Sequence, residues 1–166
     1  MVKCMYILFI QTGGTIDKDY PQVRKSYSFE IADPAVGRIL RRGNPNFRYS
    51  VVSLMKKDSL DMTDKDRKNM VRFCRAARAK RIIITHGTDT MTKTAKELRV
   101  IKNKIIVLTG AMRPEKFSDS DAMFNVGSAV GAISCLPAGV YIAMNARIYP
   151  WNRCRKNANC QFVEVE

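Results

Sequence analysis

Residues 81–90 read RIIITHGTDT, and this stretch contains both a clear strand signal and an unusual concentration of polar side chains. Residues 81–85 are β-branched and almost continuously apolar, which is typical of a strand whose two faces are both covered. Residues 85–90 contain three threonines, an aspartate and the only histidine of the chain. A helical pattern follows directly. The stretch therefore indicates a buried strand, a polar loop and a helix in succession, which is the repeating unit of α/β proteins.

The same succession recurs along the whole chain. Apolar segments indicate strands at residues 5–11, 47–55, 81–85, 104–110 and 139–145. Helical patterns lie between them, at about residues 34–42, 64–79, 89–100 and 122–136. Because connections between parallel strands are right-handed, we expect a three-layer, doubly wound α/β fold with a largely parallel sheet and helices on both faces. We expect residues 1–166 to form one such domain.

Capping residues set the expected ends of two of these helices. Asp33 followed by Pro34 predicts a helix start, and Gly43 predicts the position just beyond its end. Thr63 with Asp66 three residues later is a weaker form of the capping box. The helix after residue 85 is expected to begin at residue 88 or 89, and the one before Pro137 to be capped by residue 121.

Four of the expected strands end in polar clusters that are rich in glycine. These clusters are TGGTID (12–17), KKDSLDMTD (56–64), THGTDT (85–90) and TGAMRP (109–114). In open parallel sheets, ligands bind outside the carboxyl ends of the strands. The sequence therefore predicts a ligand site where these four clusters converge.

The composition restricts the class of protein. No apolar run approaches the roughly 20 residues of a membrane span, so we expect no membrane partner. The five cysteines contain no CxxC pair, which favours reduced thiols and a cytoplasmic location. No grouping of histidines and acids has metal-ligand spacing, so no metal is expected.

The net charge of +14 predicts affinity for polyanions that weakens with salt. The basic residues are spread along two expected helices and not gathered in a recognition motif, which favours solvated faces with incidental polyanion affinity. They are Arg67, Lys68, Arg72, Arg75, Arg78, Lys80 and Arg81, and then Lys93, Lys96, Arg99, Lys102 and Lys104.

The residues of the polar clusters suit acyl transfer. Glycines let the backbone approach a ligand and offer N–H groups to an oxyanion, whereas the spacing of a phosphate-binding loop is missing. A threonine attacks a carbonyl only when a neighbouring group accepts its proton. The hydroxyls available are those of Thr12, Thr15, Tyr27, Ser59, Thr85, Thr88 and Thr90.

The motifs TGGTID, DSLDMTD, HGTDTM and VLTGAMRP, in this order, resemble the bacterial-type L-asparaginase/glutaminase family. The resemblance runs from about residue 5 to residue 145. The usual member carries a second, smaller domain, and the closing segment GVYIAMNARIYPWNRCRKN looks like that of a short form without it. The resemblance implies hydrolysis of L-asparagine without a cofactor, and assembly into a homodimer or larger oligomer.

The resemblance also implies catalytic roles. Thr15 matches the nucleophile, and Tyr27 matches the tyrosine of the loop that covers the substrate. Thr88 and Asp89 match the second threonine and the aspartate that binds the substrate α-ammonium.

Further positions match the substrate-binding residues. Ser59 matches the residue that binds the α-carboxylate, with backbone amides at Gly14 and Gly87 beside it. Ala111 lies where the family's backbone contacts the side-chain amide.

Two positions depart from the family pattern as we align it. The relay lysine is expected on the helix after FN, where Leu136 falls near its place. Lys93 and Lys116 are weak candidates to replace it, and Tyr27 or a hydroxide-supplied water is favoured. Because Tyr27 and hydroxide both become more effective as pH rises, we expect the rate of hydrolysis to increase toward about pH 9. Leu60 replaces a glutamine that contacts substrate in many members.

Several polar residues have simpler explanations. His86 is expected to pack beside the site without acting as a base, Thr12 to satisfy backbone groups, and Thr90 to cap or pack at a helix start. The expected function is an L-asparaginase with an acyl-threonine intermediate. The alternatives are a catalytically weak or dead amino-acid-binding pseudoenzyme and a basic interaction module.

Overall fold

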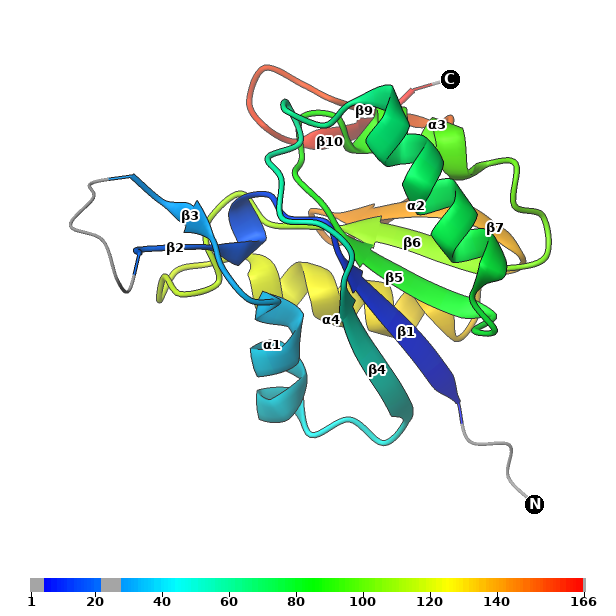
Figure 1. Ribbon diagram of the computed structural model, residues 1–166, viewed down its shortest axis with the longest axis horizontal. Helices are drawn as coiled ribbons and strands as arrows, with labels where there is room; N and C mark the ends of the chain where they lie inside the picture. Colours follow the sequence, from blue (N-terminus) through cyan, green and yellow to red (C-terminus); the bar gives the residue numbers. More distant parts are fainter. Residues whose placement is uncertain (1–4, 22–27, 166) are drawn as a thin grey trace.

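The computed structural model describes residues 5–21 and 28–165, and its centre is a six-stranded sheet (Figure 1). The order across the sheet is β4-β1-β5-β6-β7-β8, with all pairs parallel except β7 with β8. The strands are β1 (Tyr6–Gln11), β4 (Arg48–Ser53), β5 (Arg81–Thr85), β6 (Ile105–Thr109), β7 (Gly139–Met144) and β8 (Arg147–Pro150). The expected doubly wound, largely parallel sheet is confirmed, and all five expected strands occur within one or two residues of their expected ends.

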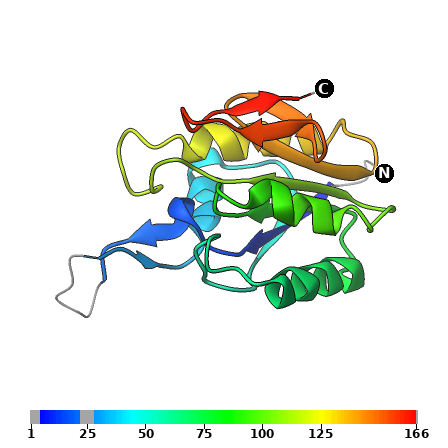
Figure 2. The same ribbon diagram turned by 90° about the horizontal axis from the view of Figure 1, so that it is seen from above.

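Helices cover both faces of the sheet, as Figures 1 and 2 show. One face packs against two helices through a core that includes Phe9, Val36 and Val126, and the other face packs through Ile84, Met70 and Leu98. The first pair is α1 (Ala35–Gly43) and α4 (Ala122–Ile133), and the second is α2 (Asp64–Ala76) and α3 (Met91–Leu98). Both faces of β1 and β5 are therefore buried, which explains their continuous apolar sequence.

The capping box of α2 is confirmed, because Thr63 and Asp66 exchange side-chain and backbone hydrogen bonds. The predicted start of α1 is wrong by one residue. Its N-cap is Pro34, and the Ala35 amide donates instead to Asp17 Oδ1 at 2.8 Å. Asp33 has no capping role because its carboxylate pairs with a lysine across the surface.

Other helix ends also differ from the prediction, and α2 and α4 each end three residues before the expected residues 79 and 136. Helix α1 includes Gly43 and ends at Asn44, whose left-handed φ of 42° closes the helix. Helix α3 begins at Met91 with Thr90 as its N-cap, so residues 88 and 89 stay in the loop. The loop is longer than expected because its polar groups bond to neighbouring loops and not to the first turn of α3.

Small elements that the sequence did not reveal lie around the sheet. A 3-10 turn, η1 (Thr15–Asp17), leads into a two-stranded hairpin of β2 (Lys18–Asp19) and β3 (Glu30–Ile31). A second hairpin, β9 (Cys154–Lys156) with β10 (Phe162–Glu164), follows β8 and buries Cys154 and Phe162 in the α2/α3 core. These strands have two or three residues each, too few for a periodic pattern to identify them.

Strand β1 lies at the point where the chain changes direction in the sheet. Its first crossover leads through α1 to β4 on one side, and the next leads through α2 to β5 on the other side. The carboxyl ends of β1 and β5 therefore meet at the topological switch point, the position known as the crevice of open α/β sheets, where ligands bind. Among the described residues, no helix is long and apolar enough to cross a membrane.

Candidate active site

Glycines bring the loops after β1, β4 and β5 into direct contact. A Cβ atom on Gly14 would lie 2.4 Å from the backbone of Gly87, and one on Gly87 would lie 2.7 Å from Ser59 Cβ and Oγ. Gly14 also has a φ of 89°, which side chains other than glycine rarely adopt. Three of the predicted substrate-binding residues, Gly14, Ser59 and Gly87, therefore form one contiguous surface because two of them have no side chain.

The same close packing extends to the neighbouring loops. A Cβ on Gly110 would lie 2.4 Å from the His86 carbonyl oxygen, and one on Gly13 would lie 2.3 Å from the Lys57 carbonyl oxygen. Thr12 Oγ1 donates to the Thr85 carbonyl at 2.8 Å, so this hydroxyl satisfies backbone as expected. The four loops are thereby fixed against each other, as the sequence predicted from their places at successive strand ends.

Ser59 presents a buried hydroxyl without a partner. Its side chain is 1% exposed, and its Oγ has no hydrogen-bond partner among the described residues. The Ser59 carbonyl accepts from Thr90 Oγ1 at 2.8 Å, and Thr90 in turn accepts from Arg67 Nη2 at 3.0 Å. Thr90 therefore holds the Ser59 loop in place. A buried polar group left unsatisfied is unfavourable, so this hydroxyl is suited to a ligand acceptor.

The strongest polar cluster of the site joins the loop after β5 to the β9–β10 hairpin. Lys156, the last residue of β9, donates from Nζ to Thr88 Oγ1 at 2.9 Å and to Asp89 Oδ1 at 2.6 Å. Thr88 is 7% exposed, and the Lys156 side chain is 19% exposed. A hydroxyl, an ammonium and a carboxylate thus meet at the carboxyl end of β5, which is an arrangement that can move a proton.

The expectation that the chain has no lysine at this place is wrong. Lys93 pairs with Asp64 at 3.1 Å, and Lys116 pairs with Asp19 at 3.3 Å, so both candidates lie elsewhere. The lysine that reaches Thr88 comes from the closing segment and not from the helix after FN. It was missed because Lys156 lies 68 residues from Thr88 in sequence, on a strand of three residues. The RKN tripeptide of that segment was the only sequence signal.

Thr15 lies in the loop after β1, which packs against the loop that carries Thr88. Thr15 is the first residue of η1, directly after Gly14, and its side chain is partly exposed. Tyr27 lies outside the described residues. The hairpin of β2 and β3 brackets the segment that contains it. The site therefore has Thr15 on the β1 side and Thr88 on the β5 side.

The loop after β6 completes the surroundings of the crevice. Ala111 is buried, and the next amide, that of Met112, donates to both oxygens of Asp121 at 2.9 and 3.1 Å. Asp121 is the N-cap residue of α4, as predicted, but its carboxylate caps no backbone amide of that helix and accepts instead from this loop and from Asn125 Nδ2 at 2.7 Å. Asn125 also donates to the Gly110 carbonyl at 3.0 Å. Helix α4 thereby fixes the backbone on either side of Ala111.

His86 is a packing residue, as expected. Its Nδ1 lies 2.7 Å from the Gly87 carbonyl, which can only accept, so Nδ1 carries the proton. Its Nε2 then accepts from Thr94 Oγ1 at 2.8 Å. Full burial lowers the His86 pKa from 6.5 to about 4, which keeps the ring neutral near neutral pH. The ring therefore fixes the Gly87 carbonyl and leaves no nitrogen free to accept a substrate proton.

Asp17 is an unexpected buried acid next to Thr15. Its side chain is 1% exposed, and burial raises its pKa from 3.8 to about 6, against the lowering effects of the Ala35 amide and Gln11. Its Oδ1 accepts from Ala35, as described above. The carboxyl thus ties η1 to the start of α1 and fixes the backbone that carries Thr15. Within residues 5–21 and 28–165, no group of three or more His, Cys, Asp or Glu side chains is placed to hold a metal.

The fold and this site define an α/β protein with hydroxyls, a lysine and backbone amides gathered at the switch point of its sheet. The chain belongs to the asparaginase family, because the family model described as "Asparaginase, N-terminal" matches residues 6–164.

Relatives agree with this assignment. The chain is 28% identical over 165 residues to a glutaminase-asparaginase from Acinetobacter glutaminasificans. This match covers 92% of this chain and 50% of the relative. It superposes on the thermostable L-asparaginase from Thermococcus kodakarensis with a TM-score of 0.82 and 25% identity, over 97% of this chain and 51% of that one. A probable cytoplasmic L-asparaginase from Campylobacter jejuni gives a TM-score of 0.78 and 27% identity, over 96% and 53%. The chain spans about half the length of these proteins.

Proposed function

We propose that this protein is an L-asparaginase that hydrolyses L-asparagine to L-aspartate and ammonia through an acyl-threonine intermediate. The observation that carries this proposal is the contact of Lys156 with both Thr88 and Asp89, at the end of β5 whose loop packs against the loop that carries Thr15. Such a cluster can accept and return a proton, which a threonine nucleophile and an attacking water both require.

The two charged groups of the substrate have complementary partners. The unpartnered Ser59 hydroxyl and the nearby backbone of Gly14 and Gly87 suit the α-carboxylate. Asp89 suits the α-ammonium, because its carboxylate is negatively charged and half exposed. Lys156 contacts only Oδ1 of that carboxylate. The backbone at Ala111 is the proposed contact of the side-chain amide. Holding both ends of the amino acid fixes where its amide carbon lies.

The proposed reaction proceeds in two steps. The Thr15 hydroxyl attacks the amide carbon and gives up its proton, the C–N bond breaks, and the leaving nitrogen takes up a proton to depart as ammonia. Tyr27 is proposed to bond the nucleophile in this step. A water molecule then attacks the acyl-Thr15 ester, aided by Thr88 and Lys156, and the bond to Thr15 Oγ1 breaks to release aspartate. The role proposed for a hydroxide-supplied water in place of the lysine is not needed once Lys156 is available.

Assembly, domain extent and location are part of the same proposal. We propose that residues 1–166 form one asparaginase N-terminal-like domain, supported by the six-stranded sheet that joins the long strands of the described residues. We further propose a homodimer or larger homo-oligomer that works in the cytoplasm, with incidental polyanion affinity from its charge of +14.

The test is ammonia release by the purified protein with asparagine, with glutamine as a second substrate. We expect turnover of asparagine and strong preference over glutamine, since one extra methylene displaces the amide carbon and a misplacement of about 1 Å can cost about 10²-fold. The Leu60 side chain is 72% exposed and offers no hydrogen bond to correct this.

A matched pair of variants tests the carrying observation. Lys156→Met should lower kcat by on the order of 10²-fold. Lys93→Met should leave it unchanged, because the Lys93 ammonium pairs with Asp64 on the surface. Binding of asparagine by calorimetry without ammonia release would instead identify an amino-acid-binding protein without turnover.

A further inference from the structure

A pocket lies at the opposite end of the sheet from the loops of the proposed active site. It has a volume of about 270 Å³ and is bordered by the segment after α3, the start of β7 and the segment after β8. Ile105 and Gly139 pair as the first residues of β6 and β7, so this end carries the amino ends of the parallel strands. The pocket is therefore separate from the crevice between Thr15 and Thr88.

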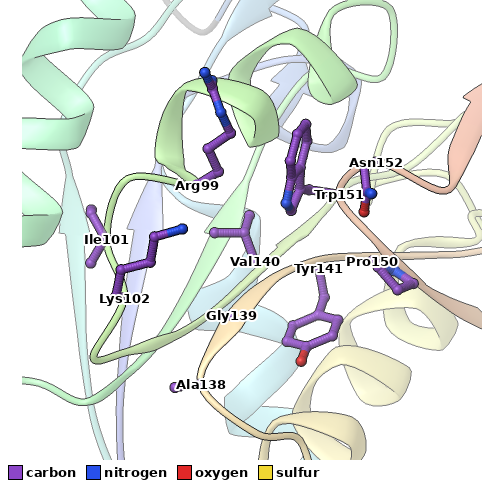
Figure 3. A pocket seen from close by; sticks show the side chains of 10 residues that line it. All are labelled: Arg99, Ile101, Lys102, Ala138, Gly139, Val140, Tyr141, Pro150, Trp151 and Asn152. Carbon is purple, nitrogen blue, oxygen red and sulfur yellow. The ribbon is translucent and has the colours of Figure 1, made fainter.

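The residues that line this pocket combine positive charge with flat apolar surface. Arg99 and Lys102 supply two cations, and no acidic residue is among the described residues that line it. Val140, Pro150 and the indole of Trp151 supply the apolar wall. Figure 3 shows Lys102 and Trp151 on opposite sides of Val140, with the Lys102 ammonium directed toward the middle of the pocket.

The two cations differ in the contacts that they make within the protein. Arg99 donates from Nη1 to the Lys96 carbonyl at 2.6 Å, and its guanidinium lies 5.6 Å from the centre of the Trp151 ring. This contact fixes the indole in place. The Lys102 ammonium, in contrast, has neither a hydrogen bond nor an ion pair with any residue that the structure describes. The pocket therefore has one positioned aromatic wall and one unpaired charge that faces it.

We propose that this pocket binds a small aromatic carboxylate. The Lys102 ammonium pairs with the carboxylate, and the ring of the ligand packs on Val140 and Trp151. The volume of the pocket lies just below the roughly 300–1,000 Å³ of pockets that hold drug-sized ligands, which suits a ligand of one ring with a carboxylate. Small-molecule sites commonly combine apolar walls with a few placed polar groups in this way. The proposal does not depend on the asparaginase activity, since none of these residues contributes to the crevice.

The chain contains its own reporter for this test, because Trp151 is its only tryptophan. Benzoate, benzamide, acetate and AMP are each titrated while tryptophan emission is recorded. We expect benzoate to change the emission with a Kd on the order of 1 mM, which suits so small a ligand. Benzamide and acetate, which have only the ring or only the charge, should bind at least about fivefold more weakly. Equal binding of acetate, binding of AMP in place of benzoate, or no response to benzoate would overturn the proposal.

Two exposed lysines of the same region provide the matched variants. Lys102→Gln should raise the benzoate Kd about fivefold, because it removes the charge that the carboxylate pairs with. Lys96→Gln, which removes a charge from the exposed part of α3 and does not line the pocket, should leave the Kd unchanged. Both variants should release ammonia from asparagine at the wild-type rate. An unchanged benzoate Kd in Lys102→Gln would refute the assigned contact.

Discussion

Single residues decide the geometry of the crevice largely by their size and burial. Gly87 is the clearest case, since it stands between Gly14 on one side and Ser59 on the other, and either neighbour would collide with a side chain at this position. Asp17 and His86 flank the same loops as buried ionisable groups. The first two predictions therefore concern the space at a glycine and the charge state of two buried residues.

Gly87→Ala should lower asparagine turnover by about 10²-fold, because its Cβ would lie 2.7 Å from the Ser59 side chain and must displace it. The matched control is Gly127→Ala on α4, where a Cβ meets nothing within 4 Å. In a helix interior this control should add about 0.5–1 kcal/mol of stability and leave turnover unchanged. Steady-state kinetics and thermal unfolding of both variants provide the comparison, and a fully active Gly87→Ala would show that the loops can move apart freely.

Asp17→Asn should change how stability depends on pH. Burial raises the Asp17 pKa to about 6, so folded Asp17 binds its proton more tightly than unfolded Asp17, and its contribution to stability falls as pH rises from about 4 to about 6. Burial lowers the His86 pKa to about 4, so its contribution rises as pH rises from about 4 to about 6.5. The two trends oppose each other in the wild type.

Without the carboxyl at position 17, only the His86 contribution remains of these two, and it raises stability as pH rises. The free energy of unfolding of Asp17→Asn, measured in urea, should therefore increase relative to wild type by up to about 1.4 kcal/mol per pH unit between about pH 4 and about pH 6. Arg38 and Lys56 also face this carboxyl and favour its charged form, so they limit how far burial raises its pKa. A difference that stays constant across this range would contradict a raised pKa at Asp17.

At the scale of elements, the β9–β10 hairpin controls the site although it lies outside the main sheet. Lys156 pairs with Phe162 across the hairpin. Two hydrogen bonds hold Phe162 to the β7–β8 region. The Phe162 amide donates to Asn145 Oδ1 at 3.0 Å, and Tyr149 Oη donates to the Phe162 carbonyl at 2.7 Å. The position of the Lys156 ammonium therefore depends on how firmly this hairpin is fixed to the sheet.

Tyr149→Phe should lower kcat severalfold and lower the free energy of unfolding by about 1 kcal/mol, because it removes the bond that fixes Phe162 and so loosens Lys156. Tyr141→Phe is the matched control. Its hydroxyl donates to the Pro137 carbonyl at 3.2 Å on an exposed part of the molecule, away from the hairpin. Kinetics with asparagine should distinguish the two variants, and equal kcat values for them would mean that the hairpin does not position Lys156.

At the scale of the whole molecule, charge and exposed apolar surface determine how the protein meets other molecules. The charge of +14 favours anions of every kind and should make any polyanion binding fall steeply with salt. Helix α4 exposes Met123 at 49% and Phe124 at 60%, beside an apolar groove that Leu40 and Phe47 line. Contiguous apolar surface of this kind is typical of contact sites.

We expect the protein to form a homodimer or larger oligomer at micromolar concentration, as measured by light scattering. Phe124→Ser should shift the molecular mass toward the monomer, because it removes the most exposed apolar side chain of α4. Val100→Ser, an exposed apolar position outside α4, should leave the mass unchanged. A wild-type protein that is strictly monomeric under these conditions would refute the proposed assembly.

The sequence by itself determined the sheet, its helices and the edge at which the site lies. Strands such as residues 81–85 carry this information locally, because burial on both faces demands continuous apolar residues and glycine-rich loops follow at their ends. The capping box at Thr63 was likewise readable, since both partners lie within one turn. The four motifs also identified the family, and the positions of Gly14, Ser59 and Gly87 in one surface follow from the parallel strand order.

Only the tertiary structure decided which groups complete that surface. Lys156 meets Thr88 across 68 residues of sequence because a hairpin of two three-residue strands folds back over α3 and the sheet, and such short strands leave no periodic signal. In the same way Asp17, which the sequence places in the polar cluster after the first strand, caps α1 from 18 residues away in place of Asp33. Local pattern determines elements, whereas contacts between side chains on different elements depend on how those elements pack, and that packing brings Lys156 to Thr88 and Asp89.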